Sequence, residues 1–273
     1  MTFAYRMKLF RDYAKMITQL FREIFKKCQG LTAKQTIAYL QTIGSHPDVK
    51  KLADNMAERM VTAVKVDNEK TWKAAARKGT LSRQIHSSLR SNMRGSIQGV
   101  IQNIIEENSK LIRSVPADIA DRISKEAMER YLKGERWEDA VADIMAKAPH
   151  LSYNHAKLIA RTETSKANEA MTEARSRDIG ITWYFWRSSH DERVRHSHQM
   201  MDGVLCSFDY PPDPEAFYDG GSLFGPYQAG CCPNCRCYAE PVVDIEDLPD
   251  SFKVCLGGAK PRVMGKKQFL KVM

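Results

Sequence analysis

Two stretches of the chain, DERVRHSHQMMDG at residues 191–203 and CCPNCRC at residues 231–237, decide how the fold is interpreted. They enclose a long segment rich in proline, glycine and aromatic residues, and a loop of that length usually needs a function or a staple. Most of the cysteines and three histidines lie in or beside this region: Cys206, Cys231, Cys232, Cys235, Cys237, His190, His196 and His198. This concentration of soft and borderline ligands predicts a metal site.

A structural zinc site takes four Cys or His ligands in a tetrahedron, with a closely spaced pair in one segment and partners elsewhere. Cys232-Pro-Asn-Cys235 supplies the pair, and Cys237 adds a third thiolate from the same turn. His198 is our choice for the imidazole, so the predicted ligands are His198, Cys232, Cys235 and Cys237. Zinc in this Cys₃His set would be structural and would staple the loop.

Other residues leave alternatives open. His196 is the second choice for the imidazole, and Cys206 and Cys231 are reserve thiolates. Cys28 and Cys255 stand alone in the sequence, and we expect them to be buried small hydrophobes or idle thiols. In a reducing compartment, clustered cysteines are metal ligands or catalytic groups more often than disulfides.

The chain has 273 residues, enough for one large or two modest domains, and we expect two. Its hydrophobic content of 43% is ordinary for a globular protein, and no stretch approaches the roughly 18 apolar residues of a membrane span. The first residues, MTFAYRMKLFRDYAK, interrupt each apolar run with a charge, unlike a secretion signal. We therefore expect a soluble protein, made and kept in a cytoplasm.

The net charge of +9 is spread unevenly. Residues 1–100 hold 19 Lys and Arg against 7 Asp and Glu, residues 101–200 hold 16 against 16, and the remainder holds 7 against 10. A basic first third favours nucleic acid or an acidic protein surface. The alternative is a solvated polar face on long helices.

Up to about Gly180 the apolar pattern is helical. The first stripe is Phe10, Tyr13, Ile17, Leu20, Phe21, Ile24 and Phe25, and further helices are expected from Thr32 and after Pro47. The strongest stripe predicts one helix of some thirty residues: Leu81, Ile85, Leu89, Met93, Ile97, Ile101, Ile104 and Ile105.

Prolines suggest the later helix boundaries. Ser114 with Pro116 predicts a new helix start, and a short helix around Trp137 is expected to end before Pro149. Ser152 then predicts an N-cap for a helix that carries the run RTETSKANEA and a face of small residues.

The β content is expected in the last third. ITWYFWRS at residues 181–188 predicts a strand, and PVV at residues 241–243 is strand-like. The tail from Ser251 is basic and predicts either DNA contact or, preferably, a mobile solvated end. The expected fold class is α+β, divided into a basic helical region at 1–150, a small α+β domain with the zinc-stapled loop at 151–245, and a basic tail at 246–273.

The order of these motifs is similar to that of the phage Mu F-like family of head morphogenesis proteins, the minor head proteins of tailed phages. RTET on a helix is followed by an aromatic strand, D-x-R-V-R-x-S-H, D-G, a loop and P-N-C-R-C, over roughly residues 151–245. The positions that match best are Arg161, Glu163, Thr164, Asp191, Arg193, Arg195, His198, Gly203, Cys235, Arg236 and Cys237.

One departure from the family pattern supports the ligand assignment. Family members often have H-P-N-C-R-C, whereas this chain has Cys232 in place of that histidine. Both side chains bind zinc, so the exchange indicates coordination at this position.

The charged motif residues allow two interpretations. Arg193 and Arg195 could pair with Asp191 and Glu163 and so bind the strand region to the helix whose RTET run begins at Arg161. The rival is an anion site for phosphate formed by arginines of the motif, namely Arg193, Arg195 and Arg236.

The resemblance implies a non-enzymatic minor head protein of a tailed phage or prophage, made in the bacterial cytoplasm and located in the virion at the capsid interior or portal vertex. Its implied work is procapsid assembly and DNA packaging or delivery. The expected partners are the portal protein, the major capsid protein or both, and double-stranded DNA, with no membrane and no small-molecule substrate. The alternatives are a zinc-containing DNA-binding protein and a small metal-dependent nuclease in which His198 acts as general base.

Overall fold

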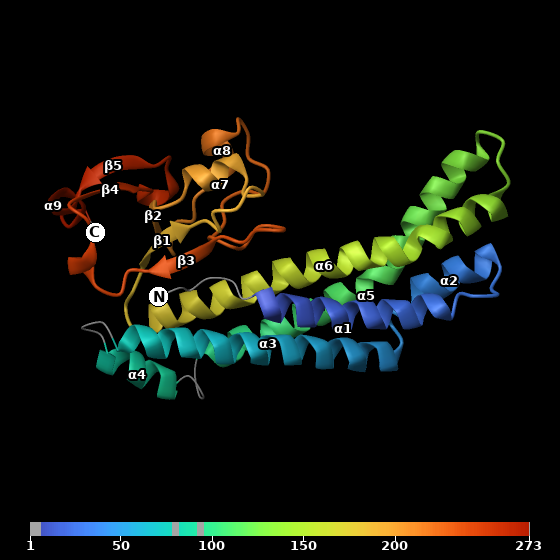
Figure 1. The fold of residues 1–273 in the computed structure, drawn as a ribbon, viewed down its shortest axis with the longest axis horizontal. Helices are drawn as coiled ribbons and strands as arrows, with labels where there is room; N and C mark the ends of the chain where they lie inside the picture. Colours follow the sequence, from blue (N-terminus) through green and yellow to red (C-terminus); the bar gives the residue numbers. More distant parts are fainter. Residues whose placement is uncertain (1–6, 78–81, 92–95, 273) are drawn as a thin grey trace. The chain divides into compact units, whose positions relative to one another are not determined.

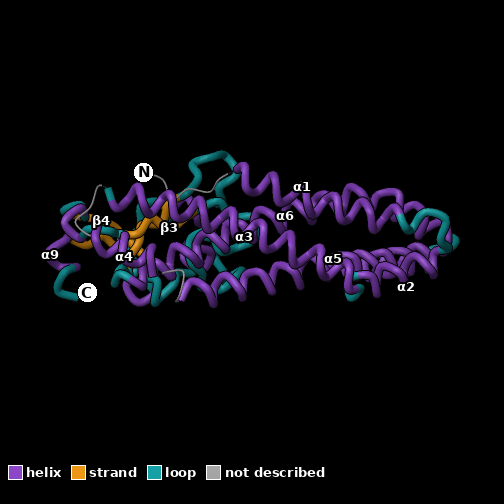
Figure 2. The backbone as a smooth tube through the Cα atoms, turned by 90° about the horizontal axis from the view of Figure 1, so that it is seen from below, coloured by secondary structure: helices purple, strands orange, loops and turns teal. Residues whose placement is uncertain are grey.

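The computed structural model describes residues 7–77, 82–91 and 96–272. Its helices are α1 (Met7–Lys26), α2 (Ala33–Ile43), α3 (Pro47–Ala76), α4 (Ser82–Ser91), α5 (Ser96–Tyr131), α6 (Trp137–Asp178), α7 (His196–Met200), α8 (Pro214–Tyr218) and α9 (Lys266–Phe269) (Figure 1). Its strands are β1 (Trp183–Arg187), β2 (Leu205–Ser207), β3 (Tyr238–Pro241), β4 (Ser251–Val254) and β5 (Arg262–Gly265), with 3₁₀ turns at η1 (Ile245–Asp247) and η2 (Leu256–Gly258). The predicted α+β class is confirmed, and Figure 2 shows how strongly helix predominates.

The chain forms two compact units. A helical unit comprises Met7–Val61 and Asn103–Glu163, and a sheet-bearing unit comprises Thr62–Gln102 and the chain from Thr164 onward. No helix among the described residues is both long and apolar enough to cross a membrane.

The helical unit is built on the first predicted stripe, whose side chains are all buried on α1, and that prediction is confirmed. A buried polar chain links three of its helices: the Tyr13 hydroxyl donates to Asn108 Oδ1 at 2.9 Å, and Asn108 Nδ2 donates to Glu163 Oε2 at 3.4 Å. Because buried polar groups need partners, these hydrogen bonds fix how α1, α5 and α6 are aligned within the unit.

Three predicted helix boundaries are wrong: the start at Ser114 and Pro116, the end before Pro149, and the N-cap at Ser152, which lies inside α6. Pro116 lies inside α5 and Pro149 lies inside α6, so both helices continue through their prolines. A proline removes one hydrogen bond and costs about 3 kcal/mol in a helix interior. Buried neighbours on either side offset that cost: Ile112 and Ile119 flank Pro116, and Ile144, Ala148 and Ser152 flank Pro149.

The strongest stripe is only partly visible. Ile85 and Leu89 lie in α4, and the positions from Ile97 to Ile105 lie in α5. Leu81 and Met93 fall outside the described residues, so the prediction of one continuous helix stays a prediction.

The sheet has the order β3-β1-β2-β4-β5. All neighbouring strands are antiparallel except β2 and β4, which are parallel. The predicted strand is confirmed as β1, where Tyr184 and Trp186 are buried and their neighbours are only partly so. The segment predicted as a loop, residues 202–230, also contains β2 and α8.

The expectation of a mobile tail is wrong, because residues 251–269 form β4, β5 and α9. Phe252 and Val254 are buried while Lys253 between them is exposed, and Met264 and Phe269 complete the same core cluster. Lys253 is the outward position of a period-two strand pattern, which a count of charges does not detect.

Candidate metal centre

The CCPNCRC stretch forms a tight turn in the sheet-bearing unit. The backbone N–H of Cys235 donates to the Cys232 carbonyl at 3.2 Å, and Asn234 has a left-handed φ of 63°. The N–H of Cys237 donates to Cys235 Sγ at 3.4 Å. Asparagine tolerates this conformation better than most residues, so the sequence Pro-Asn-Cys suits the turn.

His198 on α7 meets the thiols of this turn. Its Nδ1 lies 3.4 Å from Cys235 Sγ and 3.4 Å from Cys237 Sγ, and the ligand atoms of the three residues all lie within 4.8 Å of one another. Zinc–sulfur bonds of about 2.3 Å and zinc–nitrogen bonds of about 2.0 Å place S and N about 3.6 Å apart in a tetrahedron. His198, Cys235 and Cys237 are buried and can hold a metal ion.

Cys232 lies beside this group but is not part of it. Its Sγ is 3.8 Å from Nε2 of His198, the ring nitrogen that faces away from the other two thiols. Arg195 Nη1 donates to the same Sγ at 2.9 Å, and Arg195 Nη2 donates to the Pro233 carbonyl at 2.9 Å. Arg195 therefore supports the turn, and the role of Cys232 as fourth ligand stays a prediction.

His198 and the neighbouring Cys232 thiol both have raised pKa values. A hydrogen bond with Cys235 and burial raise the pKa of the Cys232 thiol. Burial alone lowers the pKa of His198, but hydrogen bonds with Cys232 and Cys235 outweigh it and raise that pKa to about 10. Metal ligation needs thiolates and a neutral imidazole, so an ion that binds here must displace protons.

The alternative ligands lie elsewhere. His196 Nδ1 is 3.0 Å from Asp219 Oδ1 at the surface. Cys206 is fully buried, and burial together with a hydrogen bond with Cys255 raises the pKa of its thiol. Cys255 is thus the neighbour of Cys206 in space, and it is fully buried in the core, as expected. Cys28 is buried, and its thiol donates to the Ile24 carbonyl at 3.7 Å.

The predicted arginine partners are rearranged. Asp191 makes a two-pronged ion pair with Arg236, at 2.6 Å to Nη2 and 2.5 Å to Nη1. Arg193 is exposed and gives Asp191 only its backbone N–H, at 2.9 Å. The arginine that pairs with the Asp191 carboxylate is therefore Arg236 rather than Arg193 or Arg195.

The two charged residues of the RTET run lie in the helical unit. Glu163 is buried and accepts the hydrogen bond from Asn108, while the Arg161 guanidinium lies 5.1 Å from the centre of the Phe10 ring. Both contacts are made within the helical unit, to α5 and to α1.

Glu169 and Gly230, which the sequence analysis did not single out, position the cysteine turn against α6. Glu169 is buried and accepts hydrogen bonds from the Ala239 N–H at 2.9 Å and from Asn168 Nδ2 at 3.1 Å, and burial raises its pKa to about 8. Gly230 has φ +84°, and a Cβ there would lie 2.7 Å from the Cys237 carbonyl oxygen. The signal for Glu169 was a carboxylate placed among the small residues of RTETSKANEA.

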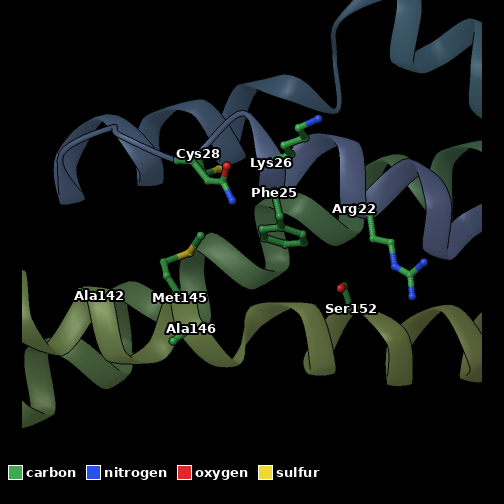
Figure 3. Close-up of a pocket in the computed structure, with 9 residues that line it drawn as sticks. Arg22, Phe25, Lys26, Cys28, Ala142, Met145, Ala146 and Ser152 are labelled. Carbon is green, nitrogen blue, oxygen red and sulfur yellow. The ribbon is translucent and has the colours of Figure 1, made fainter.

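A separate cavity of about 440 Å³ lies in the helical unit between α1 and α6. Phe25 and Met145 point into it, with Arg22 and Lys26 among the other lining residues (Figure 3). Its lining includes two cations, the Cys28 thiol and the Ser152 hydroxyl, but burial raises the pKa of Cys28 to about 11, which keeps that thiol protonated. The His/Cys group is therefore the stronger functional candidate in the described part of the chain.

Comparisons with known proteins agree with the motif order. Residues 120–240 match the model of a family described as "Phage Mu protein F like protein", so the predicted resemblance is confirmed, with the match beginning inside α5 rather than near residue 151. A protein of Haemophilus influenzae described as "Uncharacterized protein" is 33% identical over 137 residues, which are 50% of this chain and 28% of that protein. The chain thus spans less than a third of that relative's length. No solved structure matches.

Proposed function

We propose that this chain is a minor head protein of a tailed phage or prophage that acts in head morphogenesis. The observation that carries the proposal is the family match over residues 120–240, which includes His198, Cys235 and Cys237. In this proposal the protein resides in the virion, at the portal vertex or capsid interior, and acts in procapsid assembly and in DNA packaging or delivery.

The proposed partners are the portal protein or the major capsid protein, with packaged double-stranded DNA as a further one. The excess of 19 basic over 7 acidic residues in the first hundred supports a contact with a negatively charged surface. An electrostatic contact of this kind weakens as salt rises.

The metal in this proposal is zinc, and its role is structural. Support comes from the donor set of one imidazole and buried thiols, and from N–S distances that suit a tetrahedral site. The burial of His198, of which 2% is exposed, supports a non-enzymatic role, because a general base must reach its substrate.

Locating the chain in particles tests the function. Purified virions and procapsids of the parent phage or prophage should contain the chain at low copy, and mild disruption should release it together with portal or coat protein. Its absence from both particles would overturn the proposal. Plasmid nicking that copurifies with the protein and is lost in His198→Ala would favour the nuclease instead.

Metal analysis tests the zinc. The purified protein should contain about one equivalent, and Cys235→Ser should remove it and lower thermal stability. Less than half an equivalent, with stability unchanged in Cys235→Ser, would contradict the site.

A further inference from the structure

The second ring nitrogen of His198 faces a polar pair that the motif does not include. His198 Nε2 lies 2.8 Å from the Tyr227 hydroxyl oxygen. That hydroxyl lies 2.8 Å from Oε1 and 2.7 Å from Oε2 of Glu215, and Oε1 is 3.4 Å from His198 Nε2. All three side chains are buried, so the contacts are sheltered from competing water.

At Nε2 the contacts to Tyr227 and Glu215 are shorter than the 3.8 Å to Cys232 Sγ, and with Glu215 ionised they admit one consistent arrangement of protons. A carboxylate only accepts, so the Tyr227 hydroxyl donates to Glu215. The Tyr227 oxygen is then left to accept, and His198 Nε2 must carry a proton and donate it. In the neutral imidazole the lone pair therefore lies on Nδ1, the nitrogen that faces Cys235 and Cys237 at 3.4 Å.

The long loop delivers both partners. Glu215 lies in the single turn of α8, which Pro214 begins and whose Ala216 N–H donates to Asp213 Oδ1 at 3.1 Å. Tyr227 is tied to the start of the same loop, since its N–H donates to the Pro212 carbonyl at 3.0 Å. α7 and α8 are in contact, which brings the carboxylate to the histidine (Figure 1).

The ring of His198 is also held in its plane. Trp186 from β1 meets it nearly edge-on, with ring centroids 5.4 Å apart and an interplanar angle of 84°. A half-turn of the imidazole about Cβ–Cγ would put Cδ2 where Nδ1 faces the thiols and Cε1 where Nε2 faces Tyr227, and so would give up both sets of contacts. Metal-binding histidines commonly donate their second N–H to a carboxylate or another acceptor, which fixes the ring and raises its basicity.

We propose that Tyr227 and Glu215 are positioning residues that hold His198 as the Nε2–H tautomer and so make Nδ1 the metal ligand. This inference rests on the metal site of the proposed function. It assigns the loop between residues 202 and 230 a purpose beyond being stapled, because the loop supplies the hydrogen bonds that orient the histidine ligand.

Metal affinity of the full chain tests the inference. Competition between the protein and a chromophoric chelator for zinc should show Tyr227→Phe and Glu215→Gln binding about 10- to 100-fold more weakly than the parent. Tyr210→Phe and Glu192→Gln are matched controls at exposed positions and should bind as the parent does. Affinities of Tyr227→Phe and Glu215→Gln within twofold of the parent would overturn the inference.

A spectroscopic measurement on the unmutated protein keeps the test independent of folding defects. With cadmium bound and histidine side chains isotopically labelled, NMR should show metal coupling to Nδ1 of His198 and a proton on Nε2. Coupling to Nε2 would refute the assignment. Failure of the metal site itself is recognised separately: neither the parent nor Cys235→Ser would then bind zinc or cadmium, and both proposals would fall together.

Discussion

Replacing Gly230 with alanine tests whether the cysteine turn is seated on α6 through a position that admits no side chain. Gly230 has φ +84°, and an added Cβ would lie 2.7 Å from the Cys237 carbonyl oxygen and 2.9 Å from both Glu169 Cγ and Ser165 Oγ. Contacts below 3.0 Å force a shift, and the nearest atom belongs to the backbone, which moves less easily than a side-chain end.

Two costs add in Gly230→Ala. A left-handed backbone costs an L-residue about 1–2 kcal/mol, and overpacking of a well-packed site costs about 1–3 kcal/mol. We therefore expect the free energy of unfolding to fall by about 2–5 kcal/mol. The control is Gly220→Ala, because Gly220 has φ +83° and nothing within 4 Å of its added Cβ, so only the first cost applies.

Urea denaturation of both variants, with zinc and with a chelator, measures the difference. The loss in Gly230→Ala should exceed that in Gly220→Ala by about 1–3 kcal/mol in either condition, since the clash does not depend on the ion. Zinc affinity should also fall in Gly230→Ala, because the pressed carbonyl belongs to a ligand residue. Equal losses of unfolding free energy in the two variants would refute the packing cost at Gly230 and leave only the cost of the left-handed backbone.

Two further predictions follow from the same structure. Gly44→Ala should lower the free energy of unfolding by about 1–3 kcal/mol, because the added Cβ would meet the carbonyl oxygen of Arg113. Gly99→Ala, whose added Cβ has nothing within 4 Å, should raise the free energy of unfolding by about 0.5–1 kcal/mol. Denaturation curves that move the same way in both variants would contradict this. The raised pKa of Glu169, about 8, means that the folded protein binds a proton that the unfolded chain releases, so this residue's contribution to stability falls as pH rises from about 4.5 to 8, by at most about 1.4 kcal/mol per pH unit. Glu169→Gln, measured with a chelator present, should remove that part of the slope, and a pH profile parallel to the parent's would exclude a buried carboxyl with this pKa.

The helical part of the fold was predictable where local pattern and packing agree. The α1 stripe is buried as expected, and Thr32 caps α2 through a reciprocal pair of hydrogen bonds with Gln35. Pro116 and Pro149 misled because a local rule cannot weigh a single lost hydrogen bond against the burial of residues on both sides. β4 and β5 were missed because short strands with basic outward positions resemble a solvated tail.

The metal centre was predictable to the extent that ligands are close in sequence. Cys235 and Cys237 share one turn, and of the two candidate histidines it is His198 that faces their thiols, while His196 faces Asp219. Spacing did not decide the fourth metal ligand, because the Cys232 thiol accepts a hydrogen bond from Arg195 Nη1 at 2.9 Å. A Cys-x-x-Cys pattern specifies the turn, but it does not determine whether a metal ion or an arginine side chain lies beside each sulfur.

The loop and the metal centre depend on each other. Sequence spacing suggested that the ion staples the loop, yet the loop also holds the histidine, because His198 Nε2 donates to the Tyr227 hydroxyl and that hydroxyl donates to Glu215 of α8. A buried carboxylate is costly without partners, so Glu215 is tolerable only while Tyr227 and the imidazole N–H face it. Loss of Glu215 or Tyr227 would free the His198 ring to turn. The loop is therefore part of the site and not only a segment held by it, because its Tyr227 and Glu215 orient His198.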